Sequence, residues 1–254
     1  MKLLFLLLFT SCAGLSTGGS PKEGKTSYGY QDTSGTFRLV RETKTIKQKI
    51  ISRSQLLSAT GDSNKVLEKS VTVSQIGSVK SKSGRSMVIR PIASEFTVWP
   101  EGKRYFTRMK LNPKRKSMAI TMQSPEDKWN GSREVPFPKG QHFCFYSQIP
   151  ECLFHSRLLD RAEVKENQTI PFYVIWDSFP YSQEQFSGVG QGLFAPASLK
   201  FEGEKKKLLQ YIIEVDNQIL IYNFSKSKDL KKISWIAQGI LIAPPGEIVT
   251  GDAE

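Results

Sequence analysis

KRYFTRMKLNPKRKSMAITM (103–122) is the stretch of this 254-residue chain that decides the fold. Before the basic turn NPKRKS, one set of alternate side chains comprises Tyr105, Thr107, Met109 and Leu111. The other set comprises Arg104, Arg108 and Lys110, with Phe106 as the exception to the pattern. After the turn, Met118, Ile120 and Met122 alternate in the same way. Period-2 spacing places one face of a strand on a core and the other in water, so the stretch predicts an antiparallel hairpin.

Strand-forming residues extend from this hairpin toward both ends of the chain. Much of the segment 36–99 is rich in Val, Ile and Thr, and Pro91 indicates an edge or a bulge there. Similar runs recur over 197–243, with the tight-turn signal Asp216-Asn217 between two of them. About ten or eleven such strands, each with one apolar face, predict a mainly β domain. We expect a large antiparallel curved sheet or a half-open barrel.

The middle of the chain departs from this pattern. PECLFHSRLLDRAEV (150–164) has a proline at a suitable first helical position and leucines spaced for one face, which predicts one short helix. PFYVIWD (171–177) is apolar on both faces and predicts a buried central strand. Residues 177–198 show neither period, and a loop of that length is often functional or mobile.

The chain begins with a short apolar run, Leu3–Phe9, that follows Lys2. The run is far shorter than the roughly 20 residues that a membrane-spanning helix needs, but it matches a secretory signal. Phe9-Thr10-Ser11-Cys12 resembles a bacterial lipobox, which implies that residues 1–11 are a signal peptide and that Cys12 carries lipid. Phe9 stands where Leu is usual, and the signal is short. The alternatives are a buried N-terminal strand, or plain secretion with Cys12 lost or free.

The residues after Cys12 suit a lipid-anchored tether. Residues 12–35 are rich in Gly, Ser and Thr with no apolar period, as flexible linkers are. In the bacterial lipoproteins that the start resembles, Asp after the lipidated Cys keeps the protein at the inner membrane. Here that residue is Ala13, so the resemblance implies the outer membrane, facing the periplasm. Residues 36–254 are then expected to form a single β-rich domain.

The formal net charge of +12 indicates attraction to polyanions. Beyond an export signal the polyanions at hand are lipopolysaccharide and anionic phospholipid, so we expect no nucleic-acid partner. The strongest basic cluster is the hairpin, which could bind phosphate groups. Its candidate anion-binding residues are Arg104, Arg108, Lys110, Lys114, Arg115 and Lys116. The alternative is a solvated face on an edge strand, where lysines block pairing between sheets.

Two further cysteines, Cys144 and Cys152, lie close together in the sequence. In an oxidising compartment such a pair predicts a disulfide. Two free buried thiols are the first alternative. A metal site with the flanking His142 and His155 is the second, although the spacing matches no established zinc pattern. We therefore expect no metal.

Catalytic motifs give no reaction class. The chain contains no H-E-x-x-H, and its G-x-S-x-G match at 14–18 lies in the Gly/Ser-rich linker, where no strand-to-helix turn is expected. Its two histidines are expected to be structural. Carboxylate pairs such as Glu126-Asp127 and Asp160/Glu163 leave open a cell-wall or glycan hydrolase. We expect no catalytic residue and no cofactor.

The strand order and density of residues 36–254 resemble the Lol-type periplasmic lipoprotein carriers and receptors, in which an incomplete barrel holds acyl chains. No motif of that family matches residue by residue, so no binding residue is transferred. The expected function is a non-enzymatic outer-membrane lipoprotein that binds a lipid or another envelope component. Its partners would be the membrane, through the anchor, and a lipid, lipopolysaccharide or envelope protein. The alternatives are the hydrolase above and a structural scaffold for an envelope protein. The many aromatic residues could line a cavity or fill a core.

Overall fold

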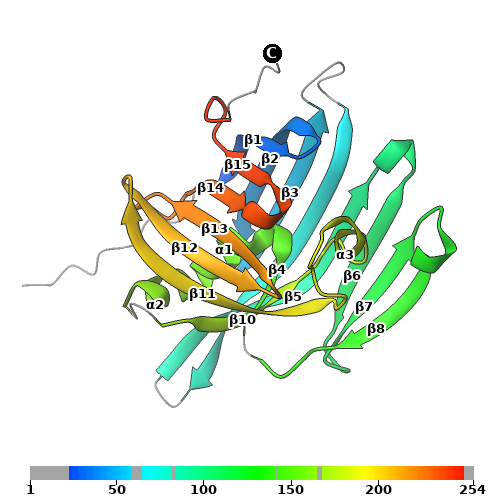
Figure 1. The fold of residues 1–254 in the computed structure, drawn as a ribbon. Helices are drawn as coiled ribbons and strands as arrows, with labels where there is room; N and C mark the ends of the chain where they lie inside the picture. Colours follow the sequence, from blue (N-terminus) through cyan, green and yellow to red (C-terminus); the bar gives the residue numbers. More distant parts are fainter. Residues whose placement is uncertain (1–22, 59–64, 82–83, 141, 165–167, 249–254) are drawn as a thin grey trace, which may run out of the picture.

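The strands form one continuous sheet that curves but does not close on itself (Figure 1). The computed structural model describes residues 23–58, 65–81, 84–140, 142–164 and 168–248. The expected signal peptide, Cys12 and the linker up to residue 22 lie outside the described residues. Within the described residues the sheet has 15 strands, and the prediction of a mainly β fold with a large open sheet is confirmed.

The sheet consists of two meanders that meet at its centre. In the first half the strands are β1 (Gly24–Asp32), β2 (Gly35–Ile46), β3 (Lys49–Ser58), β4 (Val66–Ser81), β5 (Gly84–Val98), β6 (Tyr105–Asn112), β7 (Ser117–Gln123) and β8 (Gly131–Pro136). In the second half they are β9 (Phe143–Phe145), β10 (Ile170–Ile175), β11 (Phe194–Lys205), β12 (Leu208–Val215), β13 (Gln218–Phe224), β14 (Leu230–Trp235) and β15 (Ile240–Ala243). β1 and β15 join the halves, and β8 and β9 are the edges. All neighbours are antiparallel except β9 and β10.

The hairpin that decides the fold is β6–β7, as predicted. Met109 pairs with Ile120 across it, and both side chains are buried on the inner face. β6 also pairs with β5, so it is an interior strand, and the edge-strand alternative is wrong. Phe106 lies on the outer face between two guanidinium groups, those of Arg104 and Arg108 at 4.8 and 5.5 Å from its ring centre. Cation–π stacking explains why an aromatic residue occupies the basic face.

Part of the expected linker belongs to the sheet, which corrects the boundaries of the tether and the domain. Residues Gly24–Asp32 form β1, which pairs with both β2 and β15 at the centre of the fold. The segment has few apolar residues, but Tyr28 and Tyr30 alternate toward the inner face. Backbone hydrogen bonds on both sides supply the rest of its stabilisation.

The helices lie between the meanders and inside the curve of the sheet (Figure 1). The expected helix is divided into α1 (Ile149–His155) and α2 (Leu158–Val164), because Arg157 between them is left-handed with φ of 60°. A third short helix, α3 (Tyr181–Gln185), lies within the segment expected to be a loop. No helix in the described part of the chain is long and apolar enough to span a membrane.

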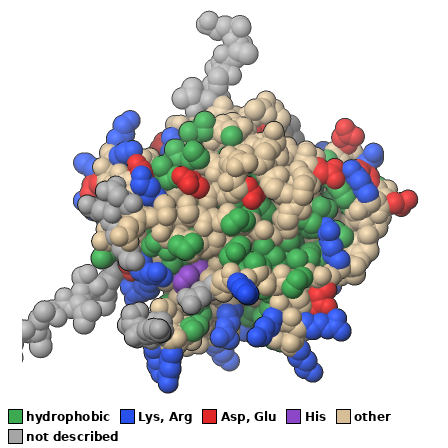
Figure 2. Space-filling model, turned by 60° about the horizontal axis from the view of Figure 1, so that its bottom comes forward, with side chains coloured by type: hydrophobic (Ala, Val, Ile, Leu, Met, Phe, Trp, Pro, Cys, Tyr) green, Lys and Arg blue, Asp and Glu red, His purple; other side chains and the backbone are tan. Residues whose placement is uncertain are grey.

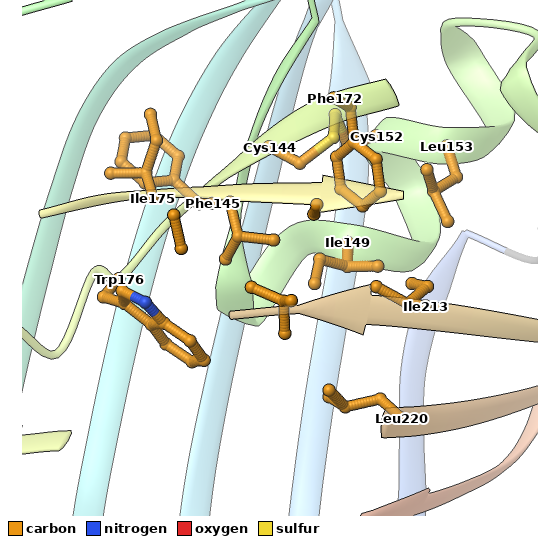
Figure 3. Packing of buried hydrophobic residues seen from close by; sticks show 14 of the residues in the cluster. Cys144, Phe145, Ile149, Cys152, Leu153, Phe172, Ile175, Trp176, Ile213 and Leu220 are labelled. Atoms are coloured by element: carbon orange, nitrogen blue, oxygen red, sulfur yellow. A yellow bond between two sulfur atoms is a disulfide. The ribbon is translucent and has the colours of Figure 1, made fainter. Parts of the chain in front are cut away.

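The core fills the inner face around α1. Figure 3 shows α1 packed between strands of the sheet, with Ile149 and Leu153 directed into the cluster. Cys144 of β9 and Cys152 of α1 form a disulfide with a Cα–Cα distance of 5.7 Å. The predicted disulfide is thus confirmed, and the alternatives of two free thiols and a metal site on these cysteines are wrong. The disulfide joins α1 to the edge strand that precedes it.

Candidate functional site

A cavity of about 120 Å³ lies between the inner face of the sheet and the segments that follow β9 and β10. On the sheet side its walls include Tyr30, Leu39, Arg41, Leu56, Glu68 and Phe96, from β1 to β5. On the other side they include Tyr146, Asp177, Tyr181 and Phe186. Most of the wall is apolar, and three charged side chains interrupt it. An apolar cavity with a few convergent polar groups is the usual form of a ligand site.

Glu68 is directed into the cavity by the alternation of β4. It shares the inner face with Ser70, Thr72 and Ser74, which are buried. Among the described residues, no group donates a hydrogen bond to its carboxylate and no cation pairs with it. Burial raises the pKa of Glu68 to about 7, and the Asp177 carboxylate adds to the rise. The side chain is half-buried because it borders the cavity, so the carboxyl is desolvated and yet accessible to a small ligand.

Asp177, the second carboxylate of the cavity, already has partners. The Ser147 backbone N–H and hydroxyl donate hydrogen bonds to it at 3.1 and 2.5 Å. Burial raises the pKa of Asp177, although the hydrogen bonds from Ser147 act to lower it. Asp177 therefore holds in place the 3-10 turn η3 (Tyr146–Gln148) that opens α1. Its acceptor capacity is largely used within the protein.

Arg41 is the cation of the cavity wall, and it is neutralised by Glu151. Its Nη2 lies 3.0 Å from Glu151 Oε2 and donates to the Ser147 carbonyl at 2.9 Å. Thr43 donates to the other oxygen of Glu151 at 3.0 Å. Burial acts to lower the pKa of Arg41, but Glu151 outweighs it and the pKa is raised. The pair contributes no net charge, so Glu68 and Asp177 make the cavity electronegative.

The inner faces of β3 and β4 are polar where η3 meets them. Gln148 is buried and donates to the Ile50 carbonyl and to Ser52 Oγ at 3.3 and 3.0 Å. Ser74 Oγ donates to Gln148 Oε1 at 2.6 Å. These hydrogen bonds explain why hydroxyl side chains line the inside of the sheet here. They also hold η3 in position, and its Tyr146 and Ser147 line the cavity.

Aromatic rings make up much of the remaining wall. Tyr146 packs against Trp176 and Trp235, with ring centres 4.9 and 5.9 Å away. Phe186 contacts the same Trp235 at 4.8 Å, and Tyr181 lies 6.1 Å from Phe96. Burial raises the pKa of Tyr181 to about 12 and raises the pKa of Tyr30 further, with Glu68 adding to both rises. These phenols therefore stay neutral.

The segment 177–193 closes the cavity and is held at both of its sides. Glu184 of α3 accepts hydrogen bonds from Trp129 Nε1 at 2.7 Å and from Lys128 Nζ at 2.8 Å. Farther along, Gln238 donates to the Ser187 carbonyl at 2.7 Å. The Gly190 N–H donates to Asp216 at 2.9 Å. The segment 177–193, whose sequence has neither helical nor strand periodicity, thus consists of a short helix and loops that are held in place over the cavity.

The six candidate anion-binding residues lie away from the cavity. Arg108 and Lys110 are exposed on the outer face of β6, and Arg104 is exposed just before the strand begins. Lys114, Arg115 and Lys116 form the tip of the hairpin. Arg108 pairs with Glu95 at 2.8 Å and Arg115 with Glu134 at 2.7 Å. The hairpin therefore does bring the six cations onto one convex surface, with two of them already paired.

The carboxylates proposed for hydrolysis are held by neighbouring side chains outside the cavity. Glu126 accepts a hydrogen bond from Tyr105 at 2.6 Å, and Asp160 pairs with Arg157 at 3.1 Å. Glu163 contacts Tyr211 and Lys228. The two carboxylates that share the cavity are Glu68 and Asp177, and no sequence motif had pointed to either of them. The one signal for Glu68 was the polar alternation with Ser70, Thr72 and Ser74 in β4.

The histidines lie outside the cavity too. His142 is buried, with its Nε2 3.5 Å from Arg161, and burial lowers its pKa. His155 packs edge-on against Phe154. Among the described residues, no group of three or more His, Cys, Asp or Glu side chains could hold a metal ion.

Hydrophobic side chains also reach the surface. Figure 2 shows them gathered in the middle of one face, with Lys and Arg side chains along its lower edge. The exposed large hydrophobic residues of the described chain lie on separate elements: Ile46, Val79, Val164, Ile219 and Ile236. The apolar area of Figure 2 is therefore a weaker candidate for a docking surface than the cavity is for a ligand.

Comparison of the chain with protein-family models, with curated proteins and with solved structures gives no match.

Proposed function

We propose that this protein binds an amphiphilic ligand without chemical change, in the cavity between the sheet and the segment 177–193. The observation that carries the proposal is the unpaired Glu68 carboxyl in a wall that is mostly apolar and aromatic. Desolvating a carboxyl without a partner is costly, and in a folded chain such a cost is typical of a functional site. A mostly apolar wall with an unpaired carboxyl suits a ligand that has an apolar part and a polar end.

We place this binding domain in the cell envelope, held at the periplasmic face of the outer membrane by lipid on Cys12. The lipobox-like start and the Cys144–Cys152 disulfide support this location, because disulfides persist in oxidising compartments. Several acyl chains on one cysteine are sufficient for stable anchoring, at about 0.8 kcal/mol per buried methylene.

The anchor is tested by the intact mass of the protein isolated from its own membrane. The expected mass corresponds to residues 12–254 plus acyl chains, and it rises by about two daltons on reduction of the disulfide. An unmodified mass that retains residues 1–11 would contradict the anchor and leave the cavity unaffected.

The cavity is tested by titration with 4-fluorophenethyl alcohol, followed by ¹⁹F NMR. A cavity of about 150 Å³ is known to bind a benzene ring, so a single-ring probe matches the size of this one. Leu39 lines the cavity from β2, whereas its neighbour Val40 lies on the outer face of the same strand. We expect Leu39→Trp to fill the cavity and abolish binding, and the matched variant Val40→Trp to bind as the natural chain does.

The proposal fails if the natural chain does not bind the probe, or if both tryptophan variants bind it equally. Near-ultraviolet circular dichroism of the two variants shows whether each retains its packed core.

A second candidate function follows from the two carboxylates in one cavity. A glycan hydrolase needs a raised-pKa acid beside an ionised carboxylate, and Glu68 and Asp177 supply two carboxyls. We favour binding because Ser147 already occupies Asp177 and because 120 Å³ is small for a sugar chain. Release of reducing ends from peptidoglycan or another glycan, lost in Asp177→Asn, would favour the hydrolase instead.

A further inference from the structure

The aromatic walls and the free carboxylate of the cavity together define a class of ligand. We infer that the polar end of the ligand is an organic ammonium group, which lies against Glu68 among the tyrosine rings. This inference rests on the proposed binding function and specifies what the cavity selects.

The charges of the cavity exclude an anionic end. Arg41 is the cation in the wall, and Glu151 and the Ser147 carbonyl occupy its guanidinium group. Glu68 and Asp177 remain as uncompensated negative charges when ionised. A carboxylate or phosphate at this position would be repelled by both, whereas a cation would pair with Glu68.

The rings around Glu68 favour an ammonium group over a neutral donor. Tyr30, Tyr146 and Tyr181 line the cavity with Glu68, and Glu68 contributes to the raised pKa of each. Aromatic faces attract a desolvated cation by about 0.5–2 kcal/mol each, and cages of such rings recognise quaternary ammonium ligands. Because their pKa values are raised, the tyrosines present neutral rings that can act in this way.

The size of the cavity limits what enters. About 120 Å³ accommodates an ammonium group with a ring or a short chain, and any longer chain has to leave through the opening. The ammonium group could belong to a free amine or to the head group of a lipid, since both carry the same chemistry.

The selectivity is measured by competition against the neutral ring probe at pH 8. We expect 4-fluorophenethylamine to bind about tenfold more tightly than 4-fluorophenethyl alcohol, and 3-(4-fluorophenyl)propionate to bind more weakly than the alcohol. In Glu68→Gln the amine should lose this advantage while the alcohol still binds. The matched control Glu95→Gln, on the outer face of β5, should keep the tenfold preference.

The preference should also depend on pH. The titratable and charged groups that line the cavity with Glu68 are Asp177, Arg41, Tyr30, Tyr146, Tyr181 and Tyr222. The tyrosines and Arg41 keep their protonation state across the neutral range. Protonation of Glu68 below about pH 6 is therefore expected to bring the ratio of amine affinity to alcohol affinity toward one.

Two short-chain lipids distinguish the sources of the ammonium group. The source is a lipid head group if dihexanoyl-phosphatidylethanolamine displaces the probe and dihexanoyl-phosphatidylglycerol does not. Displacement by the free amine alone would identify a small amine. Both results support the ammonium class.

Equal affinity of the amine and the alcohol, or an amine preference that survives Glu68→Gln, would overturn the inference. Either result leaves the proposed function in place, because the neutral probe still binds. Absence of binding by all of these probes would instead overturn the proposed function.

Discussion

The inner face of β4 sets the chemistry of the cavity at the scale of single residues. Successive inward side chains are Glu68, Ser70, Thr72 and Ser74, so they form a polar row along the inner face of the sheet. Gln148 satisfies Ser74 at one end of the row, and Glu68 stays unpaired among the described residues at the other end. The site depends on this difference between the two ends.

Glu68 makes stability depend on pH in a defined direction. Its pKa of about 7 in the folded chain lies above the ordinary value, so the folded chain binds more protons there than the unfolded chain. The contribution of Glu68 to the free energy of unfolding therefore falls as pH rises from about 4.5 to 7, and it levels off above about pH 8. We expect Glu68→Gln to be about 1–3 kcal/mol more stable than the natural chain at pH 8 and equally stable near pH 4.

Urea unfolding at both pH values measures this difference. The exposed substitution Glu95→Gln is the control and should not change the pH dependence. A Glu68→Gln variant that is no more stable at pH 8 would show that the carboxyl is better solvated than its position implies.

The sequence did not reveal Glu68 because hydropathy alone assigns the wrong face of its strand to the core. In β4, Val71 and Val73 are the apolar set, and alternation would assign them to the core. They lie on the outer face, since Val71 pairs beside the outward Arg53 and Glu95. The inner face is polar because η3 brings the side chain of Gln148 against it, and no local pattern contains that contact.

Two elements attach to the inside of the sheet by polar contacts, and both border the cavity. η3 and α1 are held by Asp177, by Gln148 and by the Arg41–Glu151 pair. α3 is held by Glu184. The first attachment is buried and the second is exposed, so they should respond differently to substitution.

Removal of Glu151 should destabilise the whole domain. Glu151→Ala leaves the Arg41 guanidinium buried without its carboxylate, which typically costs about 3–5 kcal/mol. Asp160→Ala, which removes the exposed pair with Arg157, should cost less than about 1 kcal/mol. Urea unfolding compares the two variants, and equal costs would contradict the structural role of Arg41–Glu151.

Removal of Glu184 should loosen the closure alone. Glu184→Ala breaks the hydrogen bonds from Trp129 and Lys128 to α3. We expect amide exchange in Tyr181–Phe186 to accelerate at least several-fold, with global stability changed by less than about 1 kcal/mol. Hydrogen exchange with mass spectrometry tests this, with the exposed substitution Glu214→Ala in β12 as the control. Unchanged exchange in α3 would show that packing of its aromatic residues suffices to hold it.

The number of strands was underestimated because several turns lack the usual residues. Lys47-Gln48 and Lys206-Lys207 form two-residue turns with positive φ at both positions, where Asn and Gly are expected. Without that signal, β2 and β3 read as one continuous run. The turn at Asp216-Asn217 carried the signal and was predicted correctly.

At the scale of the whole molecule, the sheet follows from the alternation of apolar and polar side chains along its strands. The cavity exists because one part of the chain covers another. Period-2 patterns such as that of β6 and β7 were sufficient to predict a large open β sheet. They do not indicate that the second meander and the segment 177–193 fold back over the first. Sequence alone therefore predicts the sheet, the disulfide and the inner face of the hairpin, but not the cavity.

The charge distribution agrees with this division of roles. The candidate anion-binding residues lie on the outer face and the tip of the β6–β7 hairpin, whereas the cavity carries the unpaired carboxyl of Glu68. A basic exterior attracts polyanions, and an electronegative interior suits a cationic ligand end. The two surfaces would act independently, so substitution of Lys110 and Lys114 should leave probe binding unchanged.

Native mass spectrometry of the chain isolated from its native source tests the central claim most directly. The account predicts a non-covalent adduct of defined mass on the natural chain and on Val40→Trp, and none on Leu39→Trp. A natural chain without an adduct, or an adduct that persists in Leu39→Trp, would contradict the claim that this cavity is a binding site.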